Sequence, residues 1–83
     1  MQSGIEKFDR VMEFLERGWE IQEPVFSQFI RQTRDTLYHF RLRNPDMGQT
    51  AVFIVPTSRS LQQFFVKYNI DTSDISWRAT TEV

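Results

Sequence analysis

Residues 36–56 constrain the fold more than any other part of the chain. They read TLYHFRLR, then NPDMGQ, then TAVFIVP. Apolar and aromatic residues alternate with other types along the first part, which is the period of a half-buried strand. Asn, Pro, Asp and Gly gather between the two apolar parts, as they do in turns. The pattern therefore predicts a β-hairpin with residues 44–49 as its loop.

The register of this hairpin follows from the requirement that directly paired residues share one face of the sheet. Pairing Arg43 with Thr50 brings the large apolar residues together, whereas a slip of one residue would mix the two faces. We expect the first face to be buried, with Tyr38, Phe40, Leu42, Ala51, Phe53 and Val55 on it. The opposite face then carries His39, Arg41, Arg43, Val52 and Ile54.

The N-terminal region predicts a helix over residues 4–17. Its apolar residues recur at helical spacing, Ser3 and Glu6 match a capping box, and Gly18 is a natural stop. Residues 19–30 follow as a strand that Pro24 interrupts. Because proline cannot donate a hydrogen bond to a ladder, we expect an edge strand that is bent near this residue.

A second helix is expected after Pro56. Thr57 or Ser58 would cap its start, and Asn69 would end it in a left-handed conformation. Its apolar stripe has the spacing i, i+3, i+4, i+7 and consists of Leu61, Phe64, Phe65 and Tyr68.

These elements predict an α+β domain of order α-β-β-β-α, in which two helices pack on one face of a three-stranded antiparallel meander. The length of 83 residues allows one domain, and eight Phe among 40% hydrophobic residues supply its core. We expect the domain to span residues 1–70 and to be followed by a polar, partly frayed tail over residues 71–83.

The composition narrows the classes of function. No cysteine is present, which excludes disulfides, thiolate metal sites and cysteine nucleophiles. The first apolar residues are interspersed with acids and no apolar run has the length of a membrane span, so we expect no signal peptide and no membrane association. Together with the lack of disulfides, these features favour the cytoplasm.

The face opposite the expected helices is the candidate functional surface. The strand over residues 50–56 is apolar on both sides, and such strands are usually covered on both sides. The simplest cover is a second copy of the chain, and arginine is enriched at interfaces. We therefore predict a non-enzymatic interaction module that forms a homodimer through His39, Arg41, Arg43, Val52 and Ile54, or through its sheet edges. The alternative is that long arginine stems cover the aliphatic residues in the monomer.

The sequence gives little support for enzyme activity or for the binding of a metal or cofactor. His39 is the only histidine, and it lacks the carboxylate spacing of a metal site and a serine motif of a nucleophile. We predict no enzyme activity, no metal and no cofactor.

Nucleic-acid binding is the second hypothesis, because basic and aromatic residues interleave in YHFRLR. The contacts would come from Arg31, Arg34, Arg41 and Arg43. Against it, the net charge is −1, and Tyr38 and Phe40 point into the expected core, where they cannot stack on bases. The α-β-β-β-α order is that of double-stranded-RNA-binding domains, but their lysine cluster at the second helix is missing from TSRSLQQ.

Overall fold

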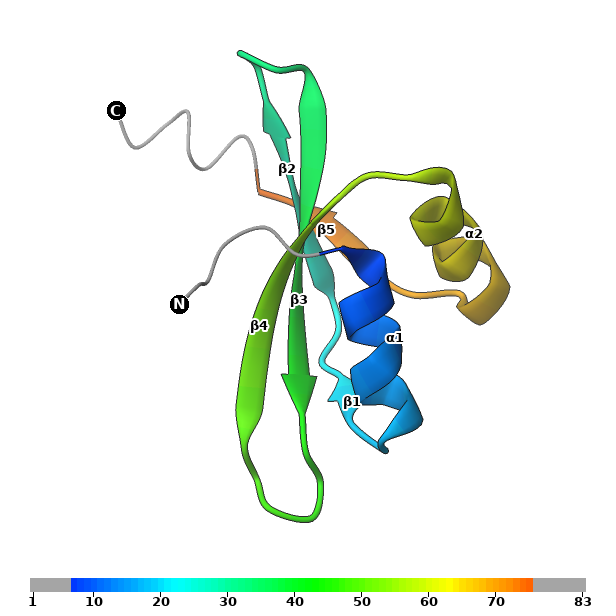
Figure 1. Ribbon diagram of the computed structural model, residues 1–83. Helices are drawn as coiled ribbons and strands as arrows, with labels where there is room; N and C mark the ends of the chain where they lie inside the picture. The colour runs from blue at the N-terminus through cyan, green and yellow to red at the C-terminus, as the bar shows by residue number, and fades with distance from the viewer. Residues whose placement is uncertain (1–6, 76–83) are drawn as a thin grey trace.

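The α+β class is confirmed by the computed structural model, which describes residues 7–75 (Figure 1). Two helices accompany a five-stranded mixed sheet that is largely antiparallel. The elements are α1 (Phe8–Glu16), β1 (Glu20–Ile21), β2 (Val25–Ile30), β3 (Asp35–Arg43), β4 (Thr50–Pro56), α2 (Arg59–Tyr68) and β5 (Thr72–Asp74).

Strand β3 is the centre of the sheet. Strand β4 pairs with it along one side, and β1 and β2 follow one another along the other side, all antiparallel to β3. The predicted hairpin register is confirmed, because Arg43 pairs with Thr50, Phe40 with Phe53 and His39 with Ile54. Both helices lie on the same side of the sheet (Figure 1).

The loop between β3 and β4 has the chemistry that its sequence predicts. The side-chain Oδ1 of Asn44 accepts a hydrogen bond from the backbone N–H of Asp46 at 3.0 Å, which is an Asx turn. Gly48 has a φ of +70°, a conformation that glycine adopts without strain. Its N–H donates to the carbonyl oxygen of Asn44 at 2.7 Å. These contacts fix the loop length and, with it, the register.

The expected bend near Pro24 separates β1 from β2. Strand β1 pairs with the end of β3 at Arg43 and Leu42, and β2 pairs with its first half. The intervening peptide bond between Glu23 and Pro24 is cis. The expected single bent strand is thus two strands on one side of β3.

Strand β5 is the element that the sequence analysis lacked, and it makes the sheet mixed. It runs parallel to β2, within the segment that we expected to be a polar tail. Two backbone bonds of 2.8 Å flank the pairing, from Val25 N–H to the Asp71 carbonyl and from Ile75 N–H to the Ser27 carbonyl. Backbone groups of an open strand edge attract any extended segment that reaches them, whatever its side chains. The other tail residues, 76–83, lie outside the described part.

Helix α1 begins later than predicted. Lys7 is extended, so the helix starts at Phe8 and not near residue 4. Ser3 and Glu6, the expected capping box, lie outside the described residues. The Phe8 ring packs against Phe40 and Phe64, with centroid distances of 6.3 and 5.1 Å. These contacts join residues that are far apart in the sequence, so a local pattern does not predict that the helix starts at Phe8.

Helix α2 has the predicted ends. The Ser58 Oγ accepts a hydrogen bond from the N–H of Leu61 at 3.2 Å, which caps the first turn. Asn69 is left-handed, with a φ of 53°, and Ile70 N–H returns to the carbonyl of Phe65 at 3.1 Å.

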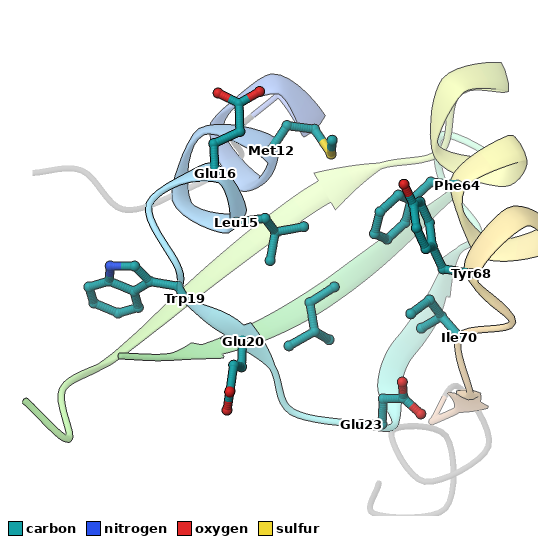
Figure 2. A pocket seen from close by; sticks show the side chains of 10 residues that line it. Met12, Leu15, Glu16, Trp19, Glu20, Glu23, Phe64, Tyr68 and Ile70 are labelled. Carbon is teal, nitrogen blue, oxygen red and sulfur yellow. The ribbon is translucent and has the colours of Figure 1, made fainter. Parts of the chain in front are cut away.

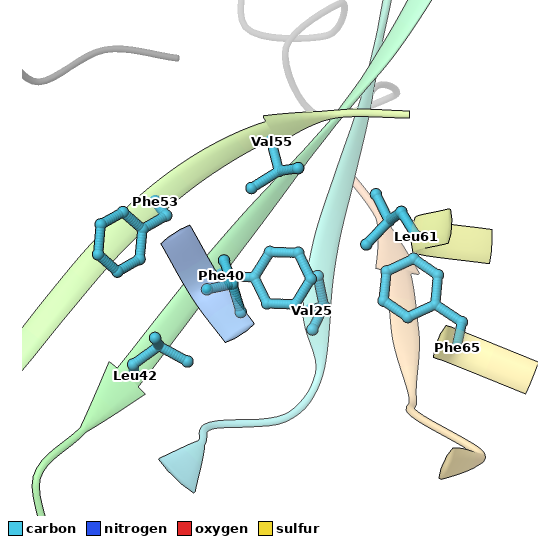
Figure 3. Close-up of a cluster of buried hydrophobic side chains, with 8 residues drawn as sticks. Val25, Phe40, Leu42, Phe53, Val55, Leu61 and Phe65 are labelled. Carbon is cyan, nitrogen blue, oxygen red and sulfur yellow. The ribbon is translucent and has the colours of Figure 1, made fainter. Parts of the chain in front are cut away.

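The core lies between the helices and the inner face of the sheet (Figure 3). Phe40 and Leu42 of β3 are fully buried, while Tyr38 and Ala51 are half-buried at the margin of the core. The predicted inner face is therefore the core face. The buried residues are Val11, Val25, Phe40, Leu42, Phe53, Val55, Leu61 and Phe65.

Candidate functional site

The outer face is the side of the sheet opposite α1 and α2, and no helix of the described chain covers it (Figure 1). The register assigns a residue of each main strand to it: Phe26 of β2, His39 of β3 and Ile54 of β4 form one cross-strand row. Val52 is 63% exposed, although it is one of the large aliphatic residues of the chain. The face therefore combines exposed and half-buried apolar groups.

Arg41 belongs to this face, and its charged end reaches along the sheet to the bend between β1 and β2. Its Nη2 donates to the carbonyl oxygens of Gln22 and Pro24 at 3.5 and 3.3 Å. Its guanidinium also lies over the Phe26 ring, 4.9 Å from the centroid. Within the described chain, Nε is buried without a hydrogen-bond partner.

The position of Arg41 explains this arrangement. The hydrogen-bond ladder that β1 and β2 form with β3 is interrupted between these two strands, where Gln22 and Pro24 lie. The backbone carbonyl of Arg41 accepts from Gln22 N–H at 2.8 Å, and the side chain bonds the carbonyls that the bend leaves without ladder partners. Arg41 thus clamps the bend, and its stem and Phe26 contribute packing surface to the outer face.

His39 is half-buried in the middle of the outer face. Its Nε2 lies 3.2 Å from Oε1 of Gln28, so the ring donates one hydrogen bond to this amide. Desolvation by the surrounding apolar residues lowers the pKa of His39. The neutral imidazole is therefore favoured.

The two exposed charged residues of β3 lie at its two ends. Asp35 begins the strand and Arg43 ends it, both exposed and both on the outer face by strand parity. Glu20 of β1 is paired opposite Arg43. The outer face thus has exposed charges at either end and, in its middle, apolar residues around His39 and Arg41.

The structure does not gather the four arginines of the nucleic-acid hypothesis. Arg31 and Arg34 lie in the exposed turn between β2 and β3, whereas Arg43 lies at the far end of β3. A nine-residue strand spans about 30 Å at ~3.3 Å per residue, which separates the two groups widely. Arg41 between them is engaged with backbone carbonyls.

Residues that the sequence analysis left out complete the outer face. Leu37 shares the parity of His39 and is half-buried, and Gln28 and Ile30 share that of Phe26. The parity of Leu37 could have been seen in the sequence, because Leu37 and Tyr38 are adjacent apolar residues and must point to opposite faces. Placing Gln28 and Ile30 on this face requires the register of β2 against β3, and residues 31–34 alone do not fix that register.

Ser58 is occupied as a helix cap. Residues 7–75 contain no group of three or more His, Asp or Glu side chains placed to hold a metal ion. Neither α1 nor α2 has the length and apolar character needed to cross a membrane.

No protein-family model matches the sequence, and no curated protein or solved structure shows significant similarity to it.

Proposed function

We propose that this protein is a small non-enzymatic module that forms a homodimer through its outer face. The observation that carries the proposal is the exposure of Val52 on a sheet face that no described helix covers. Apolar side chains on an exposed sheet face gain free energy by removal from water, and a second copy offers a matching surface. Ile54, Leu37 and the Phe26–Arg41 stack extend the patch.

The charges at the ends of β3 suit self-association. In a two-fold dimer with the faces opposed and the two β3 strands antiparallel, Arg43 of each copy approaches the Asp35 end of the other. Opposite charges then meet at both rims, while the middle of the face is buried. Because a two-fold axis repeats each contact, every favourable pair counts twice.

The nucleic-acid hypothesis has weaker support. A polyanion needs several free cations within one tract, whereas Arg41 is engaged internally and Arg31 and Arg34 lie far from Arg43. Self-association is therefore our conclusion.

Sedimentation equilibrium of Val52→Glu tests this proposal. We expect the wild-type protein to show a monomer–dimer equilibrium and Val52→Glu to weaken it at least tenfold, because each interface would bury two carboxylates. Val66→Glu is the matched control, since Val66 is 82% exposed on α2. A wild-type protein that stays monomeric at high concentration contradicts the proposal. A dimer that Val52→Glu leaves intact would point instead to pairing of sheet edges.

A charge exchange tests the orientation of the two copies. Asp35→Arg and Arg43→Asp should each weaken the dimer, because like charges would meet at both rims. The double variant should recover most of the loss. If the two losses simply add, Asp35 and Arg43 do not face each other across the dimer.

A further inference from the structure

A second surface, independent of the outer face, lies between the two helices. It is a groove of about 480 Å³ lined by half-buried apolar residues of α1, β1 and α2. Met12 and Leu15 of α1 lie across it from Phe64 and Tyr68 of α2 (Figure 2). Its volume falls within the roughly 300–1,000 Å³ of typical binding clefts.

The groove follows from how the aromatic rings are distributed. At the start of α1, Phe8 contacts Phe64 and joins the two helices, with 5.1 Å between the centroids. Two turns later, Phe14 packs instead against Trp19 and Phe53, at 4.9 and 5.0 Å. Since this ring is directed to β4 and the corner before β1, the space toward α2 is left open. Tyr68 at the opposite wall remains 55% exposed.

The rim of the groove is acidic. Glu16 of α1 and Glu23 before β2 line it, and both are exposed. Glu20 of β1 also borders it, but by strand parity its side chain belongs to the outer face beside Arg43. No lysine or arginine lines the groove, and neither Glu16 nor Glu23 forms an ion pair within residues 7–75. An apolar floor with uncompensated carboxylates around it is complementary to a ligand that is apolar in the middle and basic at its flanks.

We propose that this groove binds an amphipathic helix of another protein, with its apolar stripe on the groove floor and its Lys or Arg residues against Glu16 and Glu23. The outer face differs from the groove in carrying exposed charges of both signs, with Asp35 at one end of β3 and Arg43 at the other. The two surfaces therefore serve different contacts, and the groove does not depend on dimerisation.

The geometry favours a helix over other ligands. Strand addition would need a long open edge, whereas the strand at the groove, β1, has only two residues. A small-molecule site usually has polar groups that converge on its centre. Here the carboxylates lie on the rim and the centre is apolar. A helix with anchors at i, i+3, i+4 and i+7 places apolar side chains along such a floor and its cations at the sides.

The test uses two designed peptides with leucine at those anchor positions, one with lysine and one with glutamate at all other positions. Binding is followed by protein amide chemical shifts. We expect the Leu/Lys peptide to shift amides of Leu15, Ile21 and Tyr68 and to bind more weakly as salt is added. Glu16→Lys/Glu23→Lys should weaken binding about tenfold, through loss of two charge contacts and added repulsion. Asp9→Lys/Asp46→Lys is the control with the same net charge, because both residues are exposed and neither lines the groove, and it should bind like the wild type.

Several outcomes would overturn the proposal. The Leu/Glu peptide could bind equally well, or the two double variants could lose affinity equally, and either result would remove the role of the rim. Shifts confined to the outer face would place the peptide elsewhere. Shifts of groove amides on dilution of the protein alone would mean that a second copy, and not a basic helix, fills the groove.

Discussion

The two faces of β3 are made from alternate residues of the same strand, yet their side chains meet different surroundings. On the inner face, Phe40 is fully buried and its ring stacks with Phe65 at a centroid distance of 6.0 Å. On the outer face, Arg41 and His39 are held by polar contacts within the chain, and Val52 beside them stays exposed. The inner face is completed by the helices. The outer face is organised by contacts within the chain, but no described helix covers it.

The two faces should differ most in how much stability is lost when a side chain is replaced by alanine. Phe40→Ala should lower the free energy of unfolding by about 3–5 kcal/mol, because it leaves a cavity in the core. Val52→Ala should change it by no more than about 0.5 kcal/mol at concentrations where the protein is monomeric. Urea denaturation of both variants measures the contrast. Similar losses at the two positions would mean that Val52 is packed within the monomer.

Arg41 and Arg43 allow a sharper comparison within the outer face. Arg41→Lys keeps the charge but loses the reach to two carbonyls and the planar stack on Phe26, so unfolding should become easier by about 1–2 kcal/mol. Arg43→Lys, at an exposed position, should cost no more than about 0.5 kcal/mol. Thermal or urea unfolding separates the two. Equal effects would refute the role of Arg41 as a clamp of the bend.

The smallest expected effect concerns pH. Burial lowers the pKa of His39 in the folded protein. The unfolded chain therefore binds a proton near the ordinary histidine pKa of about 6.5, whereas the folded protein binds it only at a lower pH. Stability should therefore fall as the pH drops through and below this value. The dimer should weaken in the same direction, because Arg41 on the same face adds like charge and the partner removes water.

His39→Gln supplies the control for this pH dependence. Stability and dimer affinity, measured from about pH 7.5 to about pH 5, should lose their histidine-dependent slope in this variant. A wild-type dimer constant that stays flat over this range would place His39 outside the interface.

Much of the fold could be predicted because the informative residues are local. The hairpin register needed only the parity of the apolar residues and a loop with Asn44 and Gly48 at its turn positions. The helix ends at Ser58 and Asn69 follow from side-chain and backbone preferences of single residues. Such features do not depend on what packs elsewhere in the molecule.

The features that were missed depend on contacts between distant segments. Strand β5 consists of polar residues, and its place beside β2 rests on backbone bonds that any sequence can make. The contacts of the Arg41 guanidinium require the bend at Pro24 to leave carbonyls within its reach. The groove exists because Phe14 packs toward Trp19 and not toward α2. None of these choices is visible in a local pattern.

A dilution series followed by amide chemical shifts tests the central claim most directly, because it reports which surface is buried when copies meet. The account predicts that amides of Leu37, Val52 and Ile54 shift with protein concentration, while those of Val66 on α2 stay constant. Spectra that do not change with concentration, or changes confined to α1 and α2, would contradict it.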